Sequence, residues 1–98
     1  MVISSLDLSF EWDEEKNKIN FYKHGITFEQ AKEIFQNEHT IIQGNSELED
    51  RKIAIGVYRE VLFLAIIFTP RNKKIRIISA RRAKVKEINL YKAFYKSK

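Results

Sequence analysis

Two adjacent arginines, Arg81 and Arg82, lie at the start of a segment whose apolar spacing predicts a helix over residues 80–95. With Ser79 as the predicted N-cap, both arginines and Lys84 fall in the first helical turn. The partial positive charge of a helix N-terminus disfavours each cation there by roughly 0.3–1 kcal/mol. Free backbone N–H groups and guanidinium groups together bind phosphate well. The junction therefore predicts an anion site, although arginines on a solvated helix surface would give the same pattern.

Charge is divided unevenly along the chain. Residues 1–50 contain 11 acidic and 4 basic side chains, a net charge of −7, and residues 51–98 contain 2 acidic and 14 basic side chains, a net charge of +12. A strongly basic half is typical of proteins that bind polyanions, nucleic acids above all. A basic surface that only keeps the protein in solution is the alternative, and the arginine-rich junction favours the polyanion.

The composition argues against several classes of protein. The sequence has no cysteine, which excludes disulfides, thiolate metal sites and cysteine nucleophiles and suits the cytoplasmic location that we expect. The longest apolar run, residues 61–68, is too short for a membrane span of about 20 residues, and no signal peptide is expected. His24 and His39 lack the spacing of metal ligands, and the three glycines form no nucleotide-binding motif. We therefore expect no metal, no cofactor and no membrane contact.

The hydropathy pattern predicts a single domain over residues 1–98 in the order β-α-α-β-β-β-β-α. The predicted strands are residues 8–12, 40–43, 51–58, 61–69 and 74–79, and the predicted helices are residues 14–23, 28–35 and 80–95. Asp13 and Thr27 are the expected N-caps of the first two helices, and Gly25 is the expected end of the first. Short links between consecutive strands imply antiparallel pairing. The predicted fold class is α+β: an antiparallel sheet of about four to five strands, two N-terminal helices and one C-terminal helix.

Two motifs, taken together, resemble the BrnT family of type II toxin–antitoxin systems. The first is FEWDEEKN at residues 10–17 followed by KHGITFEQA at 23–31, and the second is IRIISARRA at 75–83. The similarity covers roughly residues 8–92. It implies a RelE-like fold and a cytoplasmic ribonuclease toxin that arrests growth by cutting RNA. It also implies a BrnA-like ribbon-helix-helix antitoxin as partner, in a heteromeric complex that binds operator DNA.

Cleavage of RNA without a metal needs groups that move protons and groups that stabilise negative charge on phosphorus. Arg76, Arg81 and Arg82 are the predicted charge-stabilising residues, although Arg76 could instead pair with an acid on a neighbouring strand. His24 is the predicted acid–base residue because histidine titrates near neutrality, with an ordinary pKa of about 6.5. A histidine that only caps the end of the first helix is the alternative.

Further residues are predicted to hold the RNA chain: Lys23, Arg51, Ser79 and Lys84. Arg51 could equally be a plain surface residue. We expect the antitoxin to lay an acidic segment over the basic surface near Arg76, Arg81 and Arg82. A non-catalytic domain that binds RNA or protein through its basic face remains the alternative function.

Overall fold

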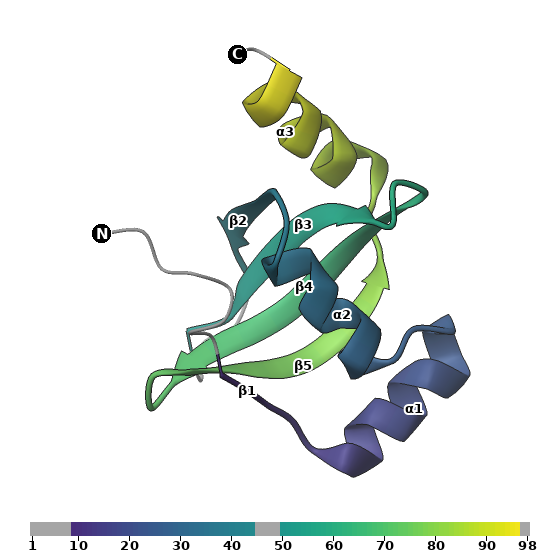
Figure 1. Cartoon of the computed structure of the whole chain (residues 1–98), viewed down its shortest axis with the longest axis vertical. Coiled ribbons are helices and arrows are strands. Elements are labelled where there is room, and N and C mark those ends of the chain that lie inside the picture. The colour runs from purple at the N-terminus through teal and green to yellow at the C-terminus, as the bar shows by residue number, and fades with distance from the viewer. Residues whose placement is uncertain (1–8, 45–49, 97–98) are drawn as a thin grey trace.

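The computed structural model describes residues 9–44 and 50–96, which form a five-stranded sheet flanked by three helices (Figure 1). In chain order the elements are β1 (Phe10–Glu11), α1 (Glu14–His24), α2 (Phe28–Phe35), β2 (His39–Gln43), β3 (Lys52–Tyr58), β4 (Leu62–Arg71), β5 (Lys74–Arg82) and α3 (Val85–Lys96). The predicted order of elements is confirmed. Residues 45–49, between β2 and β3, and the first residue of the predicted strand 8–12 lie outside the described residues.

The sheet is mixed, with strand order β1-β5-β4-β3-β2. Strands β2 to β5 pair antiparallel, whereas β1 runs parallel to β5, with Phe10 opposite Ile75 and Glu11 opposite Arg76. The prediction of a purely antiparallel sheet was therefore wrong. Short hairpin links fix the direction of neighbouring strands only, whereas residues 12–73 separate β1 from its partner β5.

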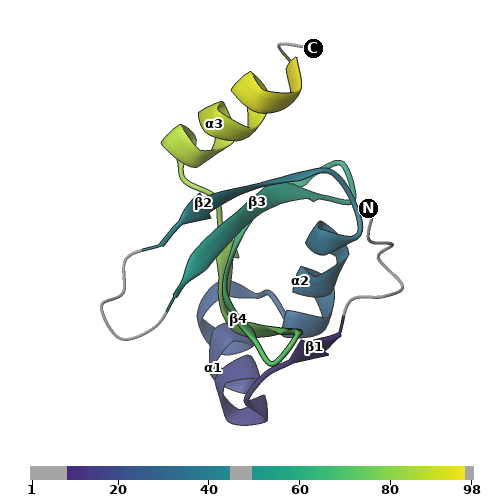
Figure 2. The same ribbon diagram turned by 90° about the vertical axis from the view of Figure 1, so that its left-hand side faces the viewer.

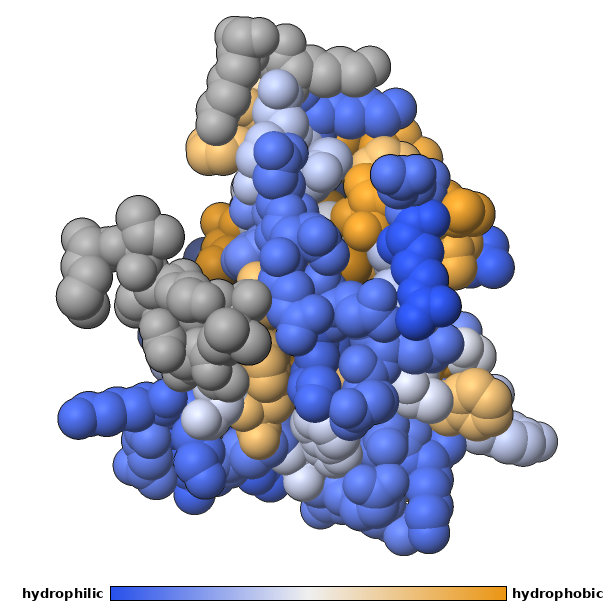
Figure 3. Space-filling view, in the orientation of Figure 1, coloured by the Kyte–Doolittle hydropathy of each residue, from blue (hydrophilic) through white to orange (hydrophobic). Residues whose placement is uncertain are grey.

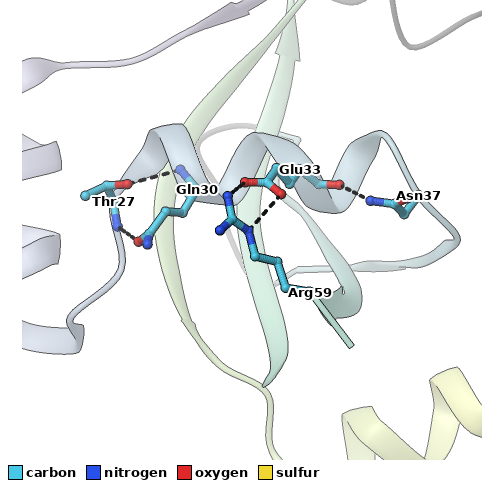
Figure 4. Close-up of polar contacts among 5 residues, drawn as sticks. All are labelled: Thr27, Gln30, Glu33, Asn37 and Arg59. Atoms are coloured by element: carbon cyan, nitrogen blue, oxygen red, sulfur yellow. Dashed lines mark hydrogen bonds and ion pairs between the residues drawn. The ribbon is translucent and has the colours of Figure 1, made fainter. Parts of the chain in front are cut away.

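The first two helices begin and end where local sequence chemistry places them. The Asp13 side chain accepts hydrogen bonds from the N–H groups of Glu15 and Lys16, and Gly25 ends α1 with a φ of 71°. Thr27 and Gln30 form a reciprocal capping box at the start of α2, with N···O distances of 2.9 and 3.0 Å (Figure 4). These contacts confirm the predicted caps.

Helices cover both faces of the sheet. α2 buries Phe28, Ala31, Ile34 and Phe35 against one face, where the side chains of Leu64, Ile66 and Phe68 form the core. α3 lies against the opposite face, above β2 and β3 (Figure 2). Figure 3 shows hydrophobic side chains gathered around the base of α3.

Two aromatic side chains seat α3 on the sheet. The ring of Tyr91 lies edge-on against Phe63 at a centroid distance of 5.7 Å, and the Tyr95 hydroxyl donates a hydrogen bond to the His39 carbonyl at 2.6 Å.

None of the helices in the described ranges 9–44 and 50–96 is long and apolar enough to cross a membrane.

The boundary between β5 and α3 differs from the prediction. β5 continues to Arg82, where Arg81 and Arg82 pair with Ala65 and Leu64 of β4, and α3 begins only at Val85. Ser79 is therefore a residue within a strand and caps no helix. The central strand β4 is ten residues long, and its backbone groups need partners along both edges, which outweighs the local helix signal. The predicted cost of cations in a first helical turn does not arise for Arg81 and Arg82.

Candidate nucleic-acid interface

A β-bulge at Ile78 determines which way the arginines of β5 point. Ile67 pairs with Ser79 and Phe68 pairs with Ile77, so Ile78 has no partner on β4. Side chains normally alternate along a strand, and one extra residue shifts that alternation. The shift sets the face on which every later side chain of β5 lies.

As a result, Arg76 and Arg81 share a face although five positions separate them. Arg76 is opposite Thr69 and Arg81 is opposite Ala65, and paired residues project from the same face. Along β4, these two partners alternate with the core residues Leu64, Ile66 and Phe68, which point toward α2. The partners and the two arginines therefore project from the other side of the sheet. We call the opposite side, which carries Arg76 and Arg81 and which α3 covers above β2 and β3, the open face.

Arg76 is held by Glu11, its partner across the parallel pair β1–β5. Arg76 Nη1 lies 2.7 Å from Glu11 Oε2, and the Arg76 side chain is 30% exposed. The alternative considered for Arg76, pairing with an acid on a neighbouring strand, is confirmed. The guanidinium nevertheless keeps other N–H groups and access to solvent, so the pair does not preclude a phosphate contact.

Arg81 is held by Glu87 of α3. Arg81 Nη1 and Nη2 lie 2.8 and 2.9 Å from the two Glu87 oxygens, and the Lys84 backbone N–H donates to the same carboxylate at 2.8 Å. Glu87 is only 3% exposed. The hydrogen bonds from Arg81 lower the pKa of the Glu87 carboxyl below its usual value, and the same bonds raise the pKa of Arg81. The pair is therefore fully ionised near neutral pH.

A small pocket between α1 and β5 joins several predicted residues. It has a volume of about 180 Å³ and is lined by Lys16, Ile19, Asn20, Lys23, His24, Ile78 and Ser79. His24, Lys23 and Ser79 were predicted separately and lie together here. Ser79 is opposite Ile67 and so also projects from the open face. The pocket therefore adjoins the face that carries Arg76 and Arg81.

Asn20 fixes the helix that forms one wall of this pocket, and the sequence prediction missed it. Its side-chain amide donates to the carbonyls of Ile26 and Ala80, both at 2.9 Å, and accepts from the Ala80 N–H at 3.0 Å. The amide thus replaces a neighbouring strand at the free edge of β5. An asparagine in the middle of a helix, where that residue is disfavoured, is the one signal that could have indicated it.

Other predicted residues lie outside this group. Arg82 is opposite Leu64 and projects toward the α2 side, so the expected cluster of three arginines is divided between two faces. Lys84 is exposed and precedes α3. Arg51 precedes β3 and lies at the same end of the sheet as Arg76. The Thr69 hydroxyl, on the residue opposite Arg76, donates a hydrogen bond to the carbonyl of Asp50, the neighbour of Arg51.

A larger pocket of about 490 Å³ lies between the end of α2, the β3–β4 hairpin and α3. It contains none of the predicted residues and is lined by two carboxylates, those of Glu38 and Glu60. Arg59, which also lines this pocket, is bound to Glu33 at 3.2 Å (Figure 4). The carboxylates of this larger pocket would repel the phosphates of RNA. The basic residues around β5 are therefore the better candidate RNA site, although the pocket beside them is smaller.

Comparison with known proteins decides the family. Residues 12–87 match the family model described as the ribonuclease toxin BrnT of type II toxin–antitoxin systems. The chain belongs to the BrnT family. A crystal structure of the Brucella abortus ribonuclease toxin BrnT is 29% identical in sequence, with a TM-score of 0.66 over 79% of this chain and 97% of that chain. No curated protein matches the chain. Within the ranges 9–44 and 50–96, no three side chains of the metal-binding types group together.

Proposed function

We propose that this BrnT-family chain is a metal-independent endoribonuclease toxin with a RelE-like fold, which cuts RNA in the cytoplasm, inhibits translation and stops growth. Family membership supports the ribonuclease activity. The observation that carries the site assignment is the placement of Arg76 and Arg81 on one face by the bulge at Ile78. Two guanidinium groups on one face can hold an RNA backbone and offset the charge that develops on phosphorus.

The neighbouring pocket supplies the proton-transfer groups of this proposal. His24 is the acid–base residue, and Lys23 lies beside it in the same pocket. Ser79 holds the RNA where the pocket meets the open face. Arg82, Lys84 and Arg51 contact flanking phosphates outside the reacting centre.

The test is cleavage of a labelled RNA by purified protein in EDTA. We expect cutting to persist, because the arginines supply the positive charge that a metal ion would otherwise provide. Full loss of cleavage on chelation, restored by a divalent ion, would contradict the metal-free mechanism.

A non-catalytic RNA-binding domain is the second candidate, and one observation favours it. Arg76 and Arg81 are already paired with carboxylates, as structural arginines often are. The same assay separates the two functions, since this candidate binds the RNA and leaves it intact.

We also propose that a BrnA-like ribbon-helix-helix antitoxin neutralises the toxin by laying an acidic segment over the open face, in a complex that binds operator DNA. Opposite charge would speed association, and added salt would slow it. RNA and antitoxin should then compete, and Arg81→Glu should weaken both. A ternary complex that binds RNA with undiminished affinity would show that inhibition works through another surface.

A further inference from the structure

The hydrogen bonds of Arg81 leave one edge of its guanidinium group unoccupied. Nη1 donates to Glu87 at 2.8 Å and to the Arg82 carbonyl at 3.2 Å, and Nη2 donates to Glu87 at 2.9 Å. A guanidinium carries five N–H donors, of which these bonds use three. Among residues 9–44 and 50–96, no acceptor is found for the Nε–H or for the second N–H of Nη2.

These two remaining donors point the same way. The guanidinium is planar, and Nη2 lies on the same side as the Nε–H group. The carboxylate of Glu87 occupies the end of the plane, between Nη1 and Nη2. The edge formed by Nε and Nη2 is therefore a two-pronged donor of the shape that two phosphate oxygens accept.

Glu87 is well suited to fix this orientation. It is 3% exposed, and its two oxygens accept three hydrogen bonds, two from Arg81 and one from the Lys84 N–H. It lies in the first turn of α3, where the helix dipole favours a carboxylate. α3 in turn is seated on the sheet by Tyr91 and Tyr95.

We infer that Glu87 is a positioning residue, which holds Arg81 by its end and presents the Nε–Nη2 edge to one phosphodiester group of the RNA. This inference rests on the proposed ribonuclease function. Arg76 differs, because one bond from Nη1 to Glu11 holds it and its plane is less constrained. The guanidinium of Arg81 therefore has the more fixed orientation of the two, which suits it to contact the scissile phosphate.

The test is Glu87→Gln, which keeps the shape of the side chain but removes one acceptor and the charge. We expect the cleavage rate at saturating RNA to fall roughly ten- to hundredfold, because small errors in the position of a reacting group reduce rates by that amount. The KM should rise by a smaller factor, because the misplaced Arg81 also holds the phosphate less well. Glu33→Gln is the matched control, since it breaks the Arg59–Glu33 pair away from the open face and should leave cleavage unchanged.

A double-mutant cycle separates orientation from stability. Lysine is a point charge without a fork, so in an Arg81→Lys protein the further change Glu87→Gln should have little additional effect. The inference would be overturned if the losses of cleavage rate from the two changes multiplied in the double variant. It would also be overturned if a folded Glu87→Gln protein cut RNA at the wild-type rate. Thermal unfolding identifies a variant that fails to fold, and Glu87→Asp then takes its place, because it keeps the charge but displaces Arg81.

Failure of the proposed function would look different. If the wild-type protein cuts no RNA, the ribonuclease assignment fails, and the RNA affinity of the same variants still tests the orientation. Weaker RNA binding by Glu87→Gln than by Glu33→Gln would then support the inference, and equal binding would contradict it.

Discussion

Arg76 and Arg81 project from the same face of β5 because the bulge residue Ile78 lies between them. In a regular strand their separation of five positions would place them on opposite faces. Bulges commonly re-aim side chains next to active sites. The single extra residue thus places Arg81 on the same face as Arg76 and directs Arg82 to the other side.

The face assignment predicts unequal roles for two neighbouring arginines. Arg81→Ala should reduce RNA cleavage about a hundredfold or more, as removal of a charge-stabilising donor does, whereas Arg82→Ala should reduce it only a few-fold. Initial rates on one labelled RNA at fixed salt check this. Equal losses in the two variants would mean that the face on which the side chain lies does not matter.

Arg81→Ala should also destabilise the fold. The substitution leaves Glu87 buried without its partner, and breaking a buried pair in this way costs about 3 kcal/mol, the lower end of the usual range because Arg81 is 23% exposed. A small gain in stability, which the predicted helix start at Ser79 would have given, is not expected. Urea unfolding measures the difference, and the double change Arg81→Ala with Glu87→Ala should recover part of the loss.

Acid should weaken the same pair. The pKa of Glu87 is lowered in the folded protein, so its stabilising contribution is complete above the ordinary carboxyl value of 4.5 and is lost as pH falls through the lower folded pKa. The free energy of unfolding of the wild type should therefore decrease more steeply below about pH 4.5 than that of Glu87→Gln. If the free energy of unfolding fell equally with pH in the two proteins, Glu87 would not contribute to the acid sensitivity of the fold.

An acid–base role for His24 predicts that cleavage depends on pH between about 5 and 8. His24→Gln should lower the rate and flatten that dependence, while the affinity for RNA stays close to that of the wild type. A pH profile that keeps its shape in the variant would favour the alternative, a histidine that only ends α1.

Asn20→Ala should loosen α1 from β5. It removes three hydrogen bonds and leaves the buried edge groups of Ala80 without partners, which costs about 2–3 kcal/mol. For a domain of this size the melting temperature should fall by roughly 10 °C or more. Ile19→Ala, a change to a half-exposed residue in the same pocket, is the control and should have a much smaller effect.

Local chemistry made the first two helices predictable. Asp13, Gly25 and the Thr27–Gln30 box act within a few residues of themselves, so their sequence is enough. The end of β5 was not predictable in this way, because the backbone of β4 decides it and the residues from Ala80 onward have a strong helical pattern of their own. The parallel pairing of β1 was not predictable either, because it depends on β5, which is distant in the sequence.

The candidate site was predictable in its residue types more than in its geometry. Clustered arginines and a histidine distant in sequence led to the predicted chemistry, and the structure brings His24, Lys23 and Ser79 into one pocket. The bulge at Ile78 could not be located from the sequence IRIIS at residues 75–79, because only pairing with β4 shows which residue is extra. The partner of Arg81 was equally hidden, since Glu87 comes within reach only once the start of α3 is known.

The parallel pairing of β1 with β5 has a consequence for the order of folding. The Glu11–Arg76 contact joins residues 65 positions apart, whereas strands β2 to β5 are joined by neighbouring links along the chain. Contacts between distant residues close a long loop and tend to form late, and a strand of two residues on the edge of a sheet is among the first parts to open. Arg76 therefore acquires its carboxylate partner near the end of folding and loses it early in unfolding, so partial opening at β1 would release this arginine while Arg81 stays clamped.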